Sequence, residues 1–165
     1  MEYNLDTLKE QIEYLNCDDY KYFYDKLISE PMFCEFKHKG LICRIVKHNS
    51  FNCGYVGVPT EHKCYQYGYD NIDANAHGGL TFSDFFEHEE SNYNEHYYIG
   101  FDCAHYNDFV PSMIHRTFTK PDFNKYKDHN FVKNECINLA EQLIDLDPKY
   151  QSMRRKKIIS QTFLK

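Results

Sequence analysis

The sequence predicts an α+β domain in which a mostly antiparallel sheet of about five strands is flanked by N-terminal helices and a C-terminal helix. Apolar residues recur every three or four positions before residue 30 and again after residue 130, which is the spacing of an amphipathic helix. Between these regions lie short runs of β-branched and aromatic residues, separated by polar and glycine-containing stretches. Because the expected strands are grouped together rather than alternating with helices, the pattern favours α+β over α/β.

The chain should begin with two helices. Over residues 5–15 the apolar side chains form one stripe, made by Leu5, Leu8, Ile12 and Leu15. Residues 16–19 can end this helix and cap a second one, which we expect from about Asp19 to Ser29. Pro31 follows, and proline does not continue a helix, so the second helix should stop before it.

The central part of the chain should form the sheet. We expect strands at residues 33–37, 41–46, 53–58, 80–83 and 97–101. His38-Lys39-Gly40 is a suitable turn for a hairpin between the first two strands. Residues 87–95 are acidic and polar, so we interpret them as an exposed connection, and residues 104–128 as irregular.

The C-terminal part should be helical. Residues 131–144 have clear amphipathic spacing, and Asp147-Pro148 should end that helix. No repeat or change of composition divides the chain, so we expect one domain over residues 1–148, followed by a basic helix or tail over 149–165. The segment from Pro148 onward carries a charge of +6 and the rest of the chain −12. A solvated basic helix is the simplest interpretation, with an oligomer contact or an anion-binding arm as the alternative.

Composition excludes several classes of protein. The chain has 165 residues and a net charge of −6, which argues against generic binding to nucleic acid. No apolar run approaches the ~20 residues that span a bilayer, so we expect no membrane association. The N-terminus has no apolar core, so no secretion signal is visible. The seven cysteines contain no C-x-x-C pair, which favours reduced thiols in a cytoplasm over disulfides or a zinc knuckle.

Two stretches carry the clearest chemistry. In the first, His77 precedes Gly78 and Gly79, whose backbone freedom lets a ligand approach main-chain N–H groups, and Thr81 follows. In the second, a strand ends in Asp102, His105 and Asp108, three residues apart, so one turn can place all three on one side. Such a group can orient a histidine base, bind a divalent metal or hydrogen-bond a polar ligand. A capped turn and a polar strand corner are the structural alternatives.

A third stretch and one weaker pattern complete the list. Tyr55 to His62 reads as a strand, a proline and a polar tip, which is a common rim for a pocket. His48 and His115 each stand in a His-x-Ser/Thr pattern, as in two-histidine phosphoesterases, but this match is short enough to arise by chance. No P-loop, dinucleotide-binding fingerprint, nucleophile elbow or H-E-x-x-H motif is present in the sequence.

The stretches together resemble a family of uncharacterised small proteins common in bacteriophage genomes. The resemblance rests on Gly-Tyr-Val-x-Val-Pro-x-x-His at residues 54–62, His-Gly-Gly-Leu-Thr at 77–81 and Gly-Phe-Asp-Cys-Ala-His-x-x-Asp at 100–108. A last part, Phe-Val-x-x-Glu followed by Leu-Ala-x-Gln-Leu, lies at 131–143, so the match runs from about residue 40 to 145. The resemblance implies a phage origin, and small accessory phage proteins often counter host defences that signal with nucleotides.

Three functions follow as hypotheses. The first is a sponge in the host cytosol, expected as a homo-oligomer, that sequesters a cyclic dinucleotide or an ADP-ribose derivative and requires no cofactor. The second is a hydrolase of such a signal, with His77, His105 and Asp102 as catalytic residues and a divalent metal as an option. The third is an inhibitor that binds a host defence protein through the acidic surface.

The residues expected at the ligand site are the same for the first two hypotheses. Tyr and Phe rings would stack on bases, and Arg44 or Lys63 would meet phosphate. The expected ligand-binding residues are Tyr55, His62, His77, Gly78, Gly79, Thr81, Asp102, His105 and Asp108.

Overall fold

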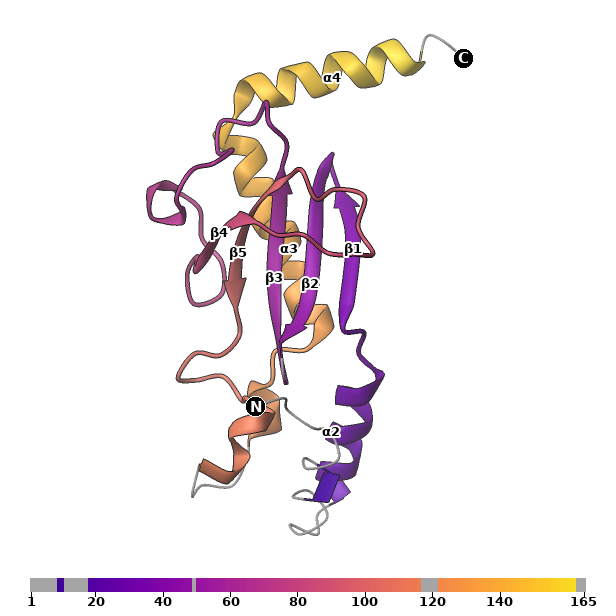
Figure 1. The fold of residues 1–165 in the computed structure, drawn as a ribbon, viewed down its shortest axis with the longest axis vertical. Helices are drawn as coiled ribbons and strands as arrows, with labels where there is room; N and C mark the ends of the chain where they lie inside the picture. Colours follow the sequence, from indigo (N-terminus) through magenta and orange to yellow (C-terminus); the bar gives the residue numbers. More distant parts are fainter. Residues whose placement is uncertain (1–8, 11–17, 49, 117–121, 163–165) are drawn as a thin grey trace.

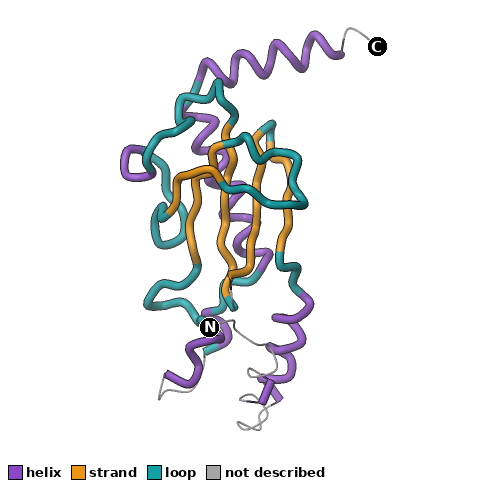
Figure 2. Tube along the Cα trace, viewed as in Figure 1, coloured by secondary structure: helices purple, strands orange, loops and turns teal. Residues whose placement is uncertain are grey.

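A computed structural model describes residues 9–10, 18–48, 50–116 and 122–162 (Figure 1). It contains a five-stranded antiparallel sheet with the spatial order β1-β2-β3-β5-β4. The helix α3 runs along one face of this sheet (Figures 1 and 2). The predicted α+β class is therefore confirmed. The helix expected over 5–15 lies outside the described residues, apart from residues 9–10, which are helical.

The elements follow the predicted order with small shifts of their ends. The helices are α2 (Asp18–Ser29), α3 (His129–Leu146) and α4 (Pro148–Thr162). The strands are β1 (Phe33–His38), β2 (Leu41–His48), β3 (Phe51–Val58), β4 (Phe82–Phe85) and β5 (Tyr97–Asp102). Three short 3₁₀ helices are η1 (Tyr69–Asn71), η2 (Pro111–Arg116) and η3 (Phe123–Lys125), so part of the segment expected to be irregular over 104–128 is helical.

Local sequence explains where these elements begin and end. The β1–β2 hairpin turns through Lys39 and Gly40, which both have positive φ (44° and 90°), as a tight two-residue turn requires. Asp128 caps α3 by accepting the Phe131 N–H, and Asp147 caps α4 by accepting the Tyr150 N–H. Capped by Asp147, α4 begins at a proline, which is tolerated in a first turn.

The main core lies between the sheet and α3. Gly54 on β3 permits their close approach, because a Cβ there would lie 2.4 Å from the Phe101 ring and 2.8 Å from Cys136 Sγ. Each fully buried Leu or Ile of α3 contributes roughly 1.5–3 kcal/mol to stability. The buried residues of α3 are Val132, Cys136, Leu139, Ala140, Leu143 and Ile144.

The opposite face of the sheet holds a buried arginine. Arg44 is fully buried, and its Nε donates to Glu35 Oε2 at 2.8 Å. Its guanidinium also bonds the Phe86 carbonyl and the Ser91 hydroxyl and lies 3.9 Å from the centre of the Tyr98 ring. The expectation that Arg44 meets a phosphate was wrong, because every side of its guanidinium has a partner inside the protein.

The same contacts revise the interpretation of residues 87–95. Their acidic side chains are exposed, as expected. Ser91, however, is buried, and the Asn94 amide oxygen accepts from Arg44 at 3.2 Å. The segment is therefore a cover over the sheet, anchored by a buried charge, rather than a loose connection.

Helix α4 forms where a basic helix or tail was predicted, and it projects from the body of the molecule (Figure 1). None of its residues is buried, although the Tyr150 hydroxyl donates to the Gly40 carbonyl at 3.4 Å. The homo-oligomer stays a prediction. Within the described residues, no helix is both long and apolar enough to cross a membrane.

Candidate functional site

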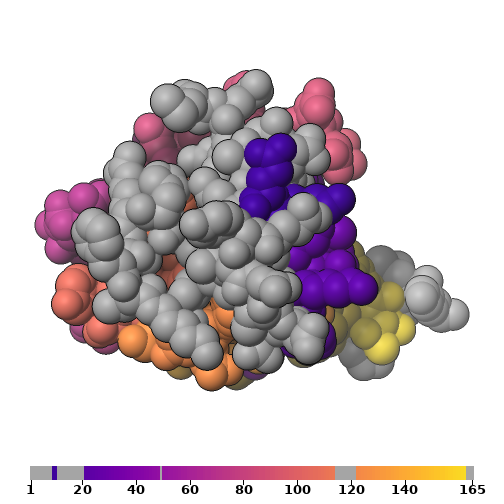
Figure 3. Space-filling model, turned by 90° about the horizontal axis from the view of Figure 1, so that it is seen from below, coloured from indigo at the N-terminus to yellow at the C-terminus, as the bar shows by residue number. Residues whose placement is uncertain are grey.

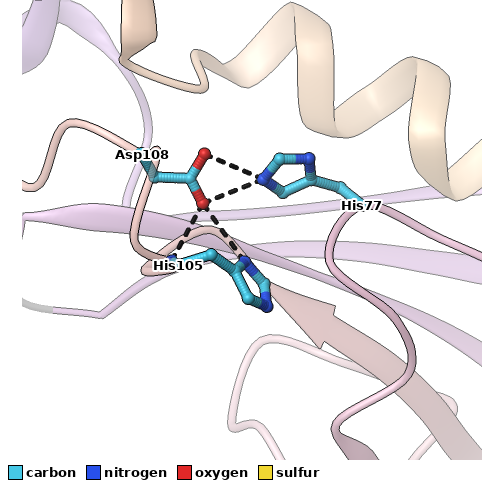
Figure 4. Close-up of side chains that lie close together, drawn as sticks. All are labelled: His77, His105 and Asp108. Atoms are coloured by element: carbon cyan, nitrogen blue, oxygen red, sulfur yellow. Dashed lines mark hydrogen bonds and ion pairs between the residues drawn. The ribbon is translucent and has the colours of Figure 1, made fainter.

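Three of the predicted residues meet at one place: His77, His105 and Asp108 (Figure 4). His77 comes from the loop before β4, whereas His105 and Asp108 come from the turn that follows β5. His77 Nε2 lies 2.9 Å from Asp108 Oδ1 and 2.8 Å from Oδ2. His105 Nδ1 lies 3.2 Å from Asp108 Oδ2, and the His105 backbone N–H donates to the same oxygen at 3.0 Å. We call these three residues the His-His-Asp cluster.

The two glycines give the cluster its shape. Gly78 and Gly79 have φ values of +70° and +95°, a region that side-chain-bearing residues rarely adopt. Gly78 has a second role, since a Cβ at that position would lie 2.0 Å from His105 Cε1. The His105 ring therefore occupies the space that a side chain at Gly78 would need. A Cβ at Gly79 would meet nothing within 4 Å, so only backbone conformation favours glycine there.

Helix α3 fixes the other side of the cluster. Glu135 Oε2 accepts the His77 backbone N–H at 2.9 Å. The His77 ring meets the Phe131 ring edge-on, with centroids 5.3 Å apart, and it meets the His105 ring in the same way at the same distance. The His77 imidazole is thus held between a helix and a turn.

Asp108 is the buried charge on which both histidines converge. Its side chain is only 1% exposed. Burial alone would raise the pKa of Asp108, but hydrogen bonds from His77 and His105 outweigh this effect, so its pKa is lowered and the carboxylate stays ionised. Lys127 Nζ lies 4.0 Å from Asp108 Oδ1 and adds positive charge.

An ionised carboxylate fixes the proton on each imidazole. Because a carboxylate only accepts hydrogen bonds, each neutral ring donates from the nitrogen that faces Asp108. The other nitrogen, Nδ1 of His77 and Nε2 of His105, is then a free acceptor. The side chains of His77 and His105 are 22% and 31% exposed, so solvent reaches them. The cluster therefore presents two partly exposed imidazoles whose orientation is set by one carboxylate.

Asp102 and Thr81 lie beside the cluster. Asp102 Oδ1 is 3.9 Å from His105 Nδ1, and Asp102 Oδ2 accepts from Thr81 Oγ1 at 3.0 Å. The sequence left open whether Asp102 or Asp108 orients a histidine, and the carboxylate within hydrogen-bonding distance of both histidines is Asp108.

His62 lies in the loop after β3 and contacts α3 at a different point from the cluster. It is 2% exposed, its Nε2 donates to the Leu143 carbonyl at 2.9 Å, and its Nδ1 accepts the Cys64 N–H at 3.1 Å. Leu143 is eight residues beyond Glu135, which is about 12 Å along a helix. Both ring nitrogens are used by the backbone, so His62 attaches a loop to α3 and does not join the cluster.

Tyr55 is a packing residue. It is 7% exposed and packs edge-on against Phe82, with ring centroids 5.2 Å apart. Its hydroxyl lies 3.1 Å from His48 Nε2. The two-histidine pattern thus has His48 paired with a buried tyrosine, and the side chain of His115 lies outside the described residues.

Cys103, between Asp102 and His105, is also a packing residue. It is 2% exposed, and burial raises the pKa of its thiol well above the ordinary value, so the reactive thiolate is disfavoured. All six cysteines in the described part of the chain are free thiols.

Sequence reasoning missed a hollow next to the cluster. It lies between α2 and the start of α3 and has a volume of about 910 Å³. Figure 3 views the molecule from this end, with α2 in indigo and residues near 122–131 in orange. We call it the α2–α3 hollow. Its lining is mostly aromatic and charged and consists of Tyr22, Phe23, Lys26, Asp122, Phe123, Asn124, Tyr126, Lys127, Asp128 and Phe131.

Two residues connect this hollow to the cluster. Phe131 contacts the His77 ring, and Lys127 lies close to Asp108 and 4.9 Å from the centre of the Phe131 ring. The Phe131–Glu135 spacing marks one face of α3, so a signal for these two residues was present in the sequence. Lys127 carried none, because a lysine before a helix cap is ordinary.

Comparison with protein-family models, curated proteins and solved structures found no match for this chain.

Proposed function

We propose that the protein hydrolyses a small nucleotide-derived molecule at the His-His-Asp cluster. The observation that carries this proposal is one buried carboxylate shared by two imidazoles from separate segments of the chain. Burying an ionised carboxylate is costly unless it is paired, and here its partners are two imidazoles, the side chain most often used for proton transfer in catalysis.

The arrangement supports general acid–base catalysis. Asp108 orients both rings and stabilises each when it is protonated, as the aspartate does in a catalytic triad. In a hydrolysis, one neutral imidazole takes a proton from the attacking water. The other imidazole, protonated, gives a proton to the leaving oxygen, so the protons balance over the reaction. Positioned acid and base groups of this kind each contribute about 10²–10⁴-fold to a rate.

The substrate class is argued from the α2–α3 hollow and from the resemblance to small phage proteins. The volume of the hollow, about 910 Å³, falls within the range of small-molecule sites. The aromatic rings of Tyr22 and Phe131 suit a base. Lys26 and Lys127 suit phosphate: Lys26 uses one donor on Asp128 at 2.6 Å, and an ammonium has three. A cyclic dinucleotide or an ADP-ribose derivative has both features.

Sequestration without cleavage, an anti-defence sponge, is the second candidate. The same hollow supports it, because its rings and lysines could hold a ligand without any proton transfer. The two candidates differ in what they require of the imidazoles. A hydrolase needs them for turnover, whereas a sponge needs the hollow for binding.

The deciding experiment follows the fate of the small molecule. Purified protein is mixed with cyclic dinucleotides and ADP-ribose derivatives, then denatured, and the released compounds are separated by HPLC. A new product supports hydrolysis, and a compound that is depleted but returns intact supports sequestration. If no compound is depleted or converted, both candidates are refuted and a host protein becomes the target to pursue by pull-down.

Variants give the assay its specificity. His77→Ala and His105→Ala should abolish product formation while the α2–α3 hollow still binds. His38→Ala is the matched control, because His38 also pairs with a carboxylate, Glu141 Oε1 at 2.6 Å, but is not one of the three cluster residues. Unchanged turnover in both cluster variants would refute the assignment of the site.

A further inference from the structure

We propose that the His-His-Asp cluster binds a divalent first-row transition metal ion, with Zn²⁺ as the species to test first. This rests on the proposed function and changes how the same residues would act: with an ion bound, His77 and His105 would be its ligands, and a water on the ion would supply the nucleophile in place of an imidazole base. The ligand atoms are one imidazole nitrogen from His77, one from His105 and a carboxylate oxygen from Asp108, and they all lie within 4.8 Å of one another.

The distances are close to those of a coordination shell. With Zn–N and Zn–O bonds of about 2.0–2.2 Å, tetrahedral ligand atoms are about 3.3–3.6 Å apart. The His105 Nδ1–Asp108 Oδ2 distance is 3.2 Å, and the His77 Nε2–Asp108 distances are 2.8 and 2.9 Å. Small side-chain rotations would therefore admit an ion. The proton on each ligating nitrogen would move to the other ring nitrogen or leave to water.

The donor set also suits a transition metal. Imidazole is a favoured ligand of zinc, iron, copper and nickel, and two imidazoles with one carboxylate leave coordination positions open for water or substrate. A metal ion there would lower the pKa of a bound water, which is how metallohydrolases obtain a nucleophile at neutral pH.

The groups around the ligands are already ordered. The His105 N–H holds Asp108 Oδ2 at 3.0 Å, and Glu135 holds the His77 backbone at 2.9 Å. Gly78 leaves room for the His105 ring. Such supporting contacts orient ligands before an ion arrives, and their loss typically lowers affinity by about 10–100-fold.

A second histidine–carboxylate pair shows what the cluster has in addition. His38 and Lys39 both contact Glu141 Oε1 at 2.6 Å, so an ammonium already occupies the position that an ion would take. The carboxylate of Glu141 is also 37% exposed, whereas that of Asp108 is 1% exposed. His38 is therefore the matched control for a histidine next to a carboxylate without a second imidazole.

The test is metal binding to the full chain, measured without any substrate. Protein stripped with a chelator is titrated with Zn²⁺ by calorimetry and with Co²⁺ by visible absorption, which reports nitrogen and oxygen ligation. We expect one ion per chain. His77→Gln and Asp108→Asn should weaken the affinity by more than about 100-fold, and His38→Ala should leave it unchanged. Circular dichroism verifies that each variant is folded.

Three results would overturn the proposal: no binding by the parent chain, the same affinity in both cluster variants, or the same loss in His38→Ala. If a variant unfolds, His105→Gln replaces it. The failure of this proposal is separable from that of the proposed function. Metal binding without cleavage would refute only the hydrolase, whereas cleavage that depends on His77 and survives chelation would refute only the metal.

Discussion

Replacing Gly78 with alanine should displace the His105 ring from Asp108. Two costs add at this position. The φ value of +70° costs a residue with a Cβ roughly 1–2 kcal/mol. The new Cβ would also lie 2.0 Å from His105 Cε1, and relieving such an overlap typically costs about 1–3 kcal/mol. The sum is a loss of about 2–5 kcal/mol, of which about 1–3 kcal/mol is the cost of moving the His105 ring away from the new Cβ.

Gly79→Ala is the matched control. Gly79 has a φ of +95°, so its replacement incurs the backbone cost of about 1–2 kcal/mol. No atom lies within 4 Å of the added Cβ, so the overlap is absent. Both variants add the same methyl group at a residue with positive φ. They differ only in whether that methyl group contacts His105.

Urea unfolding of both variants measures the free energies, and NMR of the imidazole carbons reports on the His105 ring. We expect Gly78→Ala to change the His105 resonance and to abolish any activity or metal binding that depends on that ring. Gly79→Ala should leave the resonance in place. Equal effects of the two variants on the His105 ring would refute the reasoning that Gly78 is required by this contact.

Three further outcomes are expected. Arg44→Leu should lower the free energy of unfolding in urea by about 3–5 kcal/mol, because Glu35 would keep its charge without its buried partner. A loss of less than about 1 kcal/mol would mean that water replaces the guanidinium. The pKa of Asp108 is lowered in the folded state, so its contribution to stability is complete above its ordinary value of 3.8 and is lost as the pH falls below it. Unfolding curves between about pH 2 and 6 should therefore show a smaller acid-induced loss of stability for Asp108→Asn than for the parent, and parallel curves would contradict this. His62→Ala should lower stability by about 1–3 kcal/mol, because the Leu143 carbonyl loses its partner, while metal affinity and product formation stay unchanged.

Periodicity was sufficient to predict most of the fold. The strands were found because β-branched and aromatic runs of strand length are unambiguous when glycines and prolines bound them. The strand expected at 80–83 forms at Phe82–Phe85 instead. Gly78 and Gly79 have positive φ values just before that strand. The Thr81 N–H already donates to the Gly100 carbonyl, and the paired residues of β4 begin at Phe82, opposite Gly100 on β5.

The site was predicted in part, for a physical reason. The spacing of Asp102, His105 and Asp108 requires only a local turn, which the sequence specifies. Which carboxylate binds the histidines depends on where His77 arrives from a distant loop. That contact is tertiary, so the sequence alone suggested Asp102 as readily as Asp108.

The sequence did not predict that the side chains of Arg44 and His62 are buried. Arg44 lies in a strand that is buried on both faces, so no alternation marks it, and its full burial depends on the cover formed by residues 87–95. His62 bonds a carbonyl of a helix that begins nearly 70 residues later, and no local pattern encodes that distance. Both residues have side chains typical of binding sites but serve the architecture of the protein.

The His-His-Asp cluster joins two stretches that are far apart along the chain, the loop at His77 and the turn at 105–108, and the first turns of α3 support it through Phe131 and Glu135. Contacts of such long sequence separation form late, because the chain between them must first be ordered. The cluster therefore requires at least the span from His77 to Asp108, and its support by α3 requires the chain as far as Glu135. Because the cluster forms only in the folded chain, a ligand that binds it stabilises the fold. At 100 times its dissociation constant, such a ligand would add about 2.7 kcal/mol to the free energy of unfolding. Binding at the cluster should therefore slow hydrogen exchange in the first turns of α3, where Phe131 and Glu135 contact His77.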